Sequence, residues 1–104
     1  MELEHDQARF LRCIGEPTRL SIIKLLAGGE KCVGDITRLL DRGQPLVSHH
    51  LRTLKCCNIV VERQEAQKVY YRLADESIAG LVDDSEALVR DLPICRNEEV
   101  CCEG

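Results

Sequence analysis

The spacing of apolar residues changes twice along this chain, from helical to alternating and back to helical. Over roughly the first half, apolar side chains recur every three or four residues, as on one face of an α-helix. Together with its Gly and Pro breaks, the pattern predicts four helices. The first ends at Ile14 and the second spans Pro17–Leu26. The third begins at about Val33, and the fourth runs from Pro45 to about Cys56. Proline suits the first position of a helix, where no backbone N–H is needed.

After the fourth helix the period shortens to two, which is typical of β-strands. One strand begins at residues 59–61 and a second spans 69–73, with residues 65–68 joining them as a hairpin. The helical period returns from Ser77 to Leu92, and Pro93 ends it.

These elements predict a mainly α fold with a small β-hairpin, in the order α-α-α-α-β-β-α. Two helices joined by a Gly-containing turn and followed by a hairpin indicate a winged helix-turn-helix. We expect one domain at residues 1–92 and a cysteine-rich tail at residues 93–104.

The composition limits the partners and the compartment. With 104 residues, of which 44% are hydrophobic and only 3% aromatic, the chain suits one small domain with an aliphatic core. A domain of this size is marginally stable alone, which favours a dimer. No apolar run is long enough to span a membrane, and the charged start MELEHDQARF is unlike a secretory signal. We therefore expect a cytoplasmic protein with reduced thiols and no membrane partner.

Charge is divided unevenly along the chain. Residues 1–73 hold 12 Lys and Arg against 9 Asp and Glu, a net of +3, whereas residues 74–104 hold 2 against 9, a net of −7, and the sum is the net charge of −4. Six basic and two acidic residues lie between Arg42 and Arg72. If the protein binds DNA, this segment is where it does so.

The fourth predicted helix, QPLVSHHLRTLK, has the features of a DNA recognition helix. Val47, Leu51 and Leu54 share a core-facing stripe through their i, i+4, i+7 spacing. The outer side has no acidic residue and carries side-chain types that reach bases and phosphates. The candidate DNA-binding residues, including two from the hairpin, are Gln44, Ser48, His49, Arg52, Lys55, Arg63 and Lys68. We expect His50 and Tyr71 to pack inside instead.

Three segments together resemble the ArsR/SmtB family of metal-responsive transcriptional repressors. They are GEPTRLSIIKLLAGGEKCVGDI, GQPLVSHHLRTLKCCNIV and VYYRLAD, and the similarity covers about Phe10 to Asp75. The resemblance implies a homodimer paired through its first and last helices, which binds a palindromic operator and releases it when a ligand binds. Glu16 stands where the family more often has Asp, which predicts a weaker helix cap. The hairpin tip QEAQK also lacks the Gly and Arg often found there.

Several ion sites of the family are matched only in part. A zinc site between the last helices would use Asp and His, and here Asp75 matches but no His does. A Cys-Val-Cys motif at the third helix is reduced to Cys32-Val33-Gly34. Cysteines at the end of the recognition helix have counterparts in Cys56 and Cys57, of which we expect at least one to face the core. Cys13 is expected to be a small buried residue.

The tail CRNEEVCC holds three of the seven cysteines. Some family members carry three cysteines after the last helix as an arsenite site, and Cys95, Cys101 and Cys102 fit that composition. Thiolates select soft ions. Arsenite exchanges three bonds and keeps a lone pair, so three thiols suit it, whereas zinc usually takes a fourth ligand. We therefore expect As(III) as the effector, with Cd(II), Pb(II) and Hg(II) as further candidates and Cys56, Cys57 and Cys32 as candidate helpers.

Two alternatives to ion sensing remain open. The same tail cysteines could serve a redox- or persulfide-responsive repressor, or they could be incidental. An enzyme would need an activated Cys beside a His and an orienting acid. The sequence offers no such set, so we expect no catalytic residues.

Overall fold

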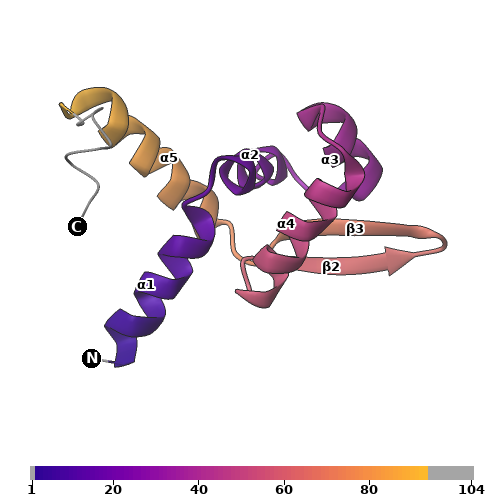
Figure 1. The fold of residues 1–104 in the computed structure, drawn as a ribbon, viewed down its shortest axis with the longest axis horizontal. Helices are drawn as coiled ribbons and strands as arrows, with labels where there is room; N and C mark the ends of the chain where they lie inside the picture. The colour runs from indigo at the N-terminus through magenta and orange to yellow at the C-terminus, as the bar shows by residue number, and fades with distance from the viewer. Residues whose placement is uncertain (1, 94–104) are drawn as a thin grey trace.

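The structure, a computed structural model, describes residues 2–93 of the chain. Figure 1 shows its five helices and the hairpin that extends from them. In chain order the elements are α1 (Glu2–Ile14), α2 (Pro17–Leu26), β1 (Lys31–Cys32), α3 (Val33–Leu40), α4 (Gln44–Cys56), β2 (Val60–Glu65), β3 (Lys68–Leu73) and α5 (Ser77–Asp91). The predicted winged helix-turn-helix is confirmed, with helix ends within one or two residues of those expected.

The start of α2 differs from expectation in how well it is capped. Pro17 occupies the first turn, as predicted. The Glu16 carboxylate accepts hydrogen bonds from Thr18 N at 3.1 Å and from Arg19 N at 3.0 Å, one with each oxygen. These N–H groups have no partner inside the helix. The sequence predicted a weaker cap than aspartate would provide, yet the longer glutamate side chain satisfies two donors.

The sheet has three strands rather than the two predicted. β1 pairs antiparallel with β3, with Lys31 opposite Tyr71 and Cys32 opposite Tyr70, so the strand order is β1-β3-β2. Two residues are too few to show a period of two, so β1 left no pattern in the sequence. The hairpin turn is also tighter than expected, because β2 runs to Glu65 and only Ala66 and Gln67 form the turn.

The core lies where α2, α3, α4 and the base of the sheet meet. It is aliphatic, as the composition predicted, with Tyr71 as its one buried aromatic ring among the described residues. The largest fully buried side chains are Ile22, Ile23, Ile36, Val47, Leu51, Leu54 and Ile59. All four elements are therefore held by the same cluster, which fixes α4 relative to the sheet.

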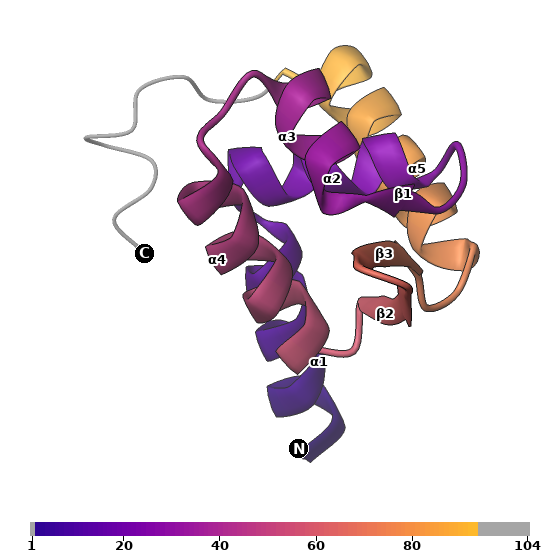
Figure 2. The ribbon, with the colours of Figure 1, turned by 90° about the vertical axis from the view of Figure 1, so that its right-hand side faces the viewer.

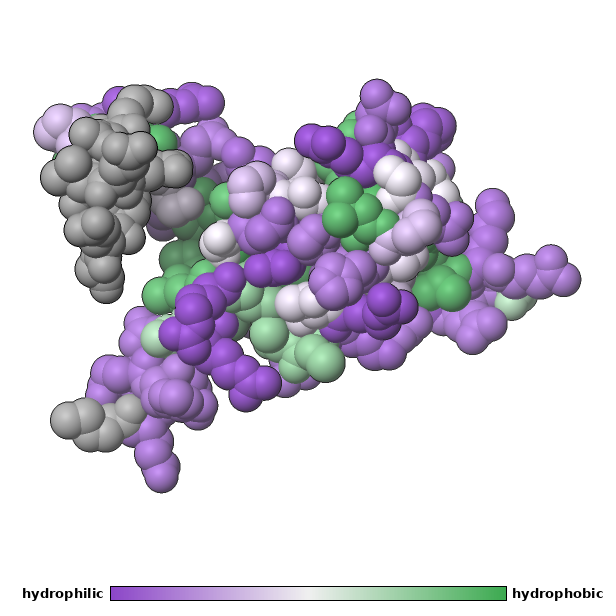
Figure 3. All heavy atoms as spheres, in the orientation of Figure 1, coloured by the Kyte–Doolittle hydropathy of each residue, from purple (hydrophilic) through white to green (hydrophobic). Residues whose placement is uncertain are grey.

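Helices α1 and α5 project from this body as two arms (Figures 1 and 2). The apolar stripe predicted for α5 is only partly buried: Ile78 and Val82 pack inside, whereas Leu81, Leu88 and Val89 are exposed. Leu3 and Leu11 of α1 are exposed as well. Figure 3 shows hydrophobic surface where the two arms join. No helix within residues 2–93 combines the length and hydropathy needed to cross a membrane.

Candidate nucleic-acid interface

The turn between α3 and α4 sets the position of the second helix. α3 ends at Leu40, and the next residue, Asp41, has a left-handed backbone conformation (φ 54°, ψ 46°) that reverses the chain. Asn and Asp tolerate this conformation better than most residues. Gly43 then precedes α4, and its carbonyl accepts the first helical bond from Val47 N at 3.1 Å. α4 therefore starts at a fixed angle against α3.

The inner face of α4 is anchored as the sequence predicted. Val47, Leu51 and Leu54 are completely buried. His50, the one buried polar residue of the described chain, is met by two groups from the start of α2. Arg19 Nη1 lies 3.2 Å from its Nδ1, and Glu16 Oε2 lies 3.5 Å from the same atom. The cap of α2 and the middle of α4 are thus joined by a polar contact beside the core.

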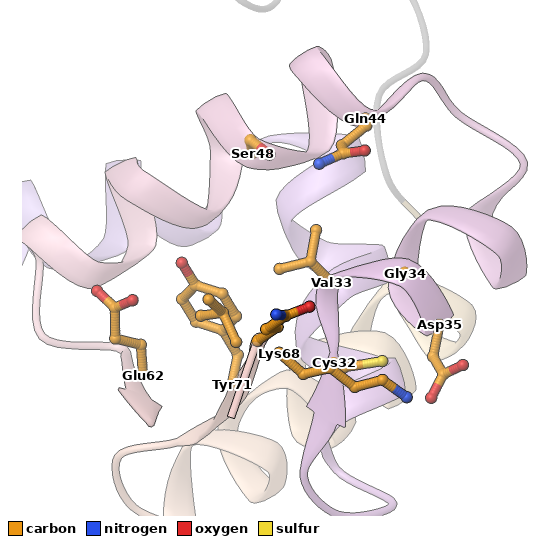
Figure 4. Close-up of a pocket in the computed structure, with 11 residues that line it drawn as sticks. Cys32, Val33, Gly34, Asp35, Gln44, Ser48, Glu62, Lys68 and Tyr71 are labelled. Carbon is orange, nitrogen blue, oxygen red and sulfur yellow. The ribbon is translucent and has the colours of Figure 1, made fainter. Parts of the chain in front are cut away.

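The polar residues of α4 divide into two groups. Gln44 and Ser48 lie on the flank that faces the sheet and help to line a cavity of about 610 Å³ between α4, the start of α3 and β3. Figure 4 shows both on the helix above this cavity, with Tyr71 and Lys68 opposite them. Ser48 is half-buried, which corrects the expectation that it points outward. His49 and Arg52 are exposed on the outer side.

Some of the predicted DNA-binding cations are engaged within the protein. Lys55 forms an ion pair with Glu62 of β2. Arg63 Nη2 lies 2.6 Å from Glu30 and its Nη1 2.8 Å from Glu65, and its guanidinium carbon sits 4.7 Å from the centre of the Tyr70 ring. The Glu30 contact, followed by the Glu65 contact, raises the pKa of Arg63. Sequence reasoning missed Glu30, because it lies 33 residues away and meets Arg63 only through the pairing of β1 with β3.

The remaining cations are free to meet an external anion. Among residues 2–93, Arg42, Arg52 and Lys68 take part in no ion pair, and all three are exposed. Arg42 precedes α4, Arg52 lies on it, and Lys68 starts β3 beside the cavity. They surround the outer side of α4 and the mouth of the cavity, so a polyanion lying along α4 would meet positive charge.

The described cysteines occupy four different settings. Cys13 is buried and Cys57 packs against the core, whereas Cys56 is exposed, in line with the expectation that one of the adjacent pair faces inward. Cys32 precedes α3 and hydrogen-bonds Asp35, whose pKa is lowered by Arg38 and then by this thiol.

Asp75, the residue that matched the family's zinc site, lies just before α5. Its carboxylate accepts hydrogen bonds from Ser77 N and Oγ at 2.9 and 2.7 Å.

Ion-binding clusters are absent from the described part of the chain. No group of three or more His, Cys, Asp or Glu side chains within residues 2–93 is placed to hold a metal ion. The candidate helpers Cys32, Cys56 and Cys57 are therefore not joined into a site there. The predicted ligands Cys95, Cys101 and Cys102 lie outside the described residues.

Comparison with known proteins agrees with this geometry. The family described as "Bacterial regulatory protein, arsR family" matches residues 16–61, which contain α2, α3 and α4. An HTH-type transcriptional regulator of Methanocaldococcus jannaschii is 39% identical over 83 residues, covering 79% of this chain and 93% of that protein. This chain belongs to the ArsR/SmtB family.

Two further proteins are similar to this ArsR/SmtB family member over most of its length. The transcriptional repressor SmtB of Mycobacterium tuberculosis is 38% identical over 86 residues, covering 83% of this chain but only 64% of the repressor's own length. A homodimeric winged helix-turn-helix DNA-binding domain of Mycobacterium bovis superposes with a TM-score of 0.78 at 30% identity, covering 86% and 83% of the two chains. These relatives are described as regulators, in agreement with the expectation that the chain is no enzyme.

Other family relatives are named after resistance to soft ions. They are a cadmium resistance regulator homologue of Staphylococcus aureus (37% identity, 75% of this chain and 65% of that one), a probable mercury resistance repressor of Streptomyces lividans (33%, 81% and 67%) and an arsenic resistance regulator of Pseudomonas putida (35%, 72% and 65%). The names of these relatives point to three different ions.

Proposed function

We propose that this ArsR/SmtB-family protein is a transcriptional repressor that binds double-stranded operator DNA with α4 in the major groove. The observation that carries the proposal is α4 itself: its inner face is fixed in the core, and its outer face is exposed, free of acidic residues and flanked by unpaired cations. In this proposal Arg52 and His49 contact base edges, and Arg42 and Lys68 contact phosphates. Gln44 and Ser48 would contact DNA that enters the mouth of the cavity.

The proposal requires two copies of the chain. A palindromic operator presents half-sites about 34 Å apart, so two recognition helices must be held at that separation. The exposed apolar residues of α1 and α5 supply a surface for this, because side chains such as Leu88 and Val89 gain free energy when a second copy covers them. The resemblance to the homodimeric M. bovis domain supports the same arrangement.

We further propose that As(III), or a related soft ion such as Cd(II), Pb(II) or Hg(II), is the signal that releases DNA. Cys95, Cys101 and Cys102 follow α5 closely in sequence and offer the three thiolates that As(III) prefers. Binding there would act on the helix proposed to hold the dimer. A small rotation between subunits would spoil the spacing of the two α4 helices, and only an affinity difference between the two dimer forms can drive it.

The first test is fluorescence anisotropy of the reduced protein on DNA from its own promoter. We expect binding before any ion is added, and release near one equivalent of As(III) per subunit, with Zn(II) inactive. Cys102→Ser should keep DNA binding and lose the response to As(III). Failure to bind any upstream DNA would overturn the DNA-binding proposal, and normal release by Cys102→Ser would overturn the tail site.

The same titration tests the redox alternative. Release by peroxide alone, abolished by replacing the tail cysteines, would make those thiols a redox switch rather than an ion site. Release by As(III) in Cys102→Ser but not in a Cys56→Ser or Cys57→Ser variant would move the ion site to the end of α4.

A further inference from the structure

The ends of α1 and α4 meet through two cysteines and one carbonyl. Cys13 lies in the last turn of α1, and its Sγ donates to the carbonyl oxygen of Thr53 at 3.7 Å. The backbone N–H of Cys57, at the end of α4, donates to the same oxygen at 3.1 Å. Both cysteines therefore converge on one atom, although they lie far apart in the sequence. Figure 2 shows α1 passing behind α4, and the two helices are in contact.

The two cysteines also share one hydrophobic cluster, because Cys57 packs against the buried core to which Cys13 belongs. Burial, and then hydrogen bonding with Cys57, raises the pKa of Cys13 to about 12, so its sulfur stays protonated at neutral pH. Cys57 is only half-buried. The pair thus consists of one protected thiol and one that is closer to solvent.

A cavity gives small solutes access to the outer member of the pair. It has a volume of about 200 Å³ and is lined by Asp6, Arg9, Phe10, Cys56, Cys57 and Asn58. Cys13 does not line it. A small oxidant would therefore meet Cys57 before Cys13.

The chemistry of two neighbouring thiols differs from that of a trithiolate site. Such a site, which suits As(III), needs a third ligand, and the part of the chain that the structure describes has no group of three suitable side chains. A disulfide needs only the two sulfurs. We propose that Cys13 and Cys57 form a reversible intramolecular disulfide when the protein meets a peroxide, joining the end of α1 to the end of α4.

The reaction balances with peroxide as the two-electron oxidant. The Cys57 thiolate attacks one peroxide oxygen, the O–O bond breaks, and Cys57 becomes a sulfenic acid while water or an alcohol leaves. Cys13 sulfur then attacks the sulfenic sulfur. The S–O bond breaks, the hydroxyl leaves with the Cys13 proton as water, and the S–S bond forms. An external thiol restores both cysteines.

The bond would connect an arm proposed to form the dimer with the helix proposed to read DNA. An effect of peroxide on operator affinity therefore rests on the proposed function, whereas formation of the bond does not. The primary readout is accordingly covalent, and DNA binding is measured separately.

The test is tryptic mapping of the full chain after peroxide treatment and blocking of free thiols. Trypsin places Cys13 in the peptide of residues 13–19 and Cys57 in that of residues 56–63, so the bond yields one linked species that a reductant separates. Because Cys56 shares the second peptide, Cys56→Ser and Cys57→Ser form the matched pair. We expect the linked species in the wild type and in Cys56→Ser, and none in Cys57→Ser or Cys13→Ser.

A second variant removes the remaining ambiguity. A chain that keeps only Cys13 and Cys57, with the other five cysteines changed to Ser, can form a single intramolecular disulfide. Intact mass should show the loss of two hydrogens at low peroxide, reversed by dithiothreitol. A linked species that persists in Cys57→Ser, or oxidised chains in which residues 13–19 stay unlinked, would overturn the proposal. Failure of the wild type to bind DNA would affect only the function proposed above.

Discussion

Helices α4 and α5 are of similar length, yet they leave opposite kinds of surface exposed. α4 buries its apolar stripe completely, with Val47, Leu51 and Leu54 at zero exposure, and presents polar and basic side chains. α5 buries only Ile78 and Val82 and leaves Leu88 at 55% and Val89 at 53% exposure. Both helices are amphipathic in sequence, so the pattern alone does not distinguish them.

The difference indicates which kind of partner each helix surface is suited to bind. An exposed row of apolar side chains gains free energy from another apolar surface, whereas exposed cations gain from a polyanion. The contrast supports the proposed protein contact of α5 and the proposed DNA contact of α4. Each prediction below pairs a change with a matched control and names the property that should respond.

The largest effect is expected from Leu51→Ala in α4. Leu51 has no solvent exposure, so its truncation leaves a cavity and should lower the free energy of unfolding by about 2–5 kcal/mol. Leu88→Ala in α5 is the matched control, because more than half of Leu88 is already exposed. Urea unfolding at low protein concentration measures both. Equal losses of unfolding free energy in the two variants would mean that Leu88 is buried in solution, although it is exposed in a single chain.

A charge on the α5 surface should break the dimer without unfolding the chain. Leu88→Glu places a carboxylate in the proposed contact of both copies, so we expect the dimer to weaken by about 2–4 kcal/mol. Sedimentation velocity over a range of concentrations measures the shift toward monomer. Asp84→Glu, on the same exposed helix, is the control and should leave the association unchanged. A Leu88→Glu protein that remains fully dimeric would place the interface elsewhere.

Removing a free cation of α4 should weaken DNA binding and leave assembly intact. Arg52→Ala should cost about 1–3 kcal/mol of operator affinity, because Arg52 is exposed and unpaired. Arg63→Ala is the matched control on the hairpin. Its guanidinium is already engaged by Glu30 and Glu65, so its loss should matter less. Anisotropy at one fixed salt concentration compares them, and a larger loss for Arg63→Ala would reverse the assignment.

The smallest effect concerns the cap that links α2 to α4. Burial alone would raise the pKa of Glu16, but bonds from the N–H groups of Arg19 and Thr18 lower it overall, with help from His50. A lowered pKa means that this stabilisation is complete above the ordinary value of 4.5 and is lost as the pH falls through the folded value. Glu16→Ala should lower stability by about 0.5–2 kcal/mol near neutral pH.

The pH dependence separates the cap from simple packing. In urea unfolding, the gap between wild type and Glu16→Ala should narrow as the pH falls below about 4.5. Glu16→Gln keeps an acceptor oxygen and should lose less stability than Glu16→Ala. A gap that stays constant down to acid pH would show that the carboxylate charge contributes nothing.

Much of the fold could be predicted from local pattern. Residues close in sequence specify the helix ends and the change of period after α4. They also specify the buried stripe of Val47, Leu51 and Leu54. Strand β1 could not be predicted, because two residues carry no period. The pairing of Arg63 with Glu30 could not be predicted either, because it depends on how β1 is aligned with β3.

The candidate site divides in the same way. The chemical types along α4 predicted a nucleic-acid surface, and the tail cysteines predicted a soft-ion site that stays a prediction. The meeting of Cys13 and Cys57 at the Thr53 carbonyl was missed, because each cysteine alone has the features of a small packing residue.

The sequence by itself determined the five helices, the two hairpin strands, the aliphatic core and the family, because periodicity and turn residues act over a few neighbours. Only the tertiary structure decided which cations form no ion pair, which apolar residues remain exposed and which two cysteines meet at one carbonyl. Those properties depend on side chains brought together from distant parts of the chain, and burial and ion pairing are settled only when the elements pack.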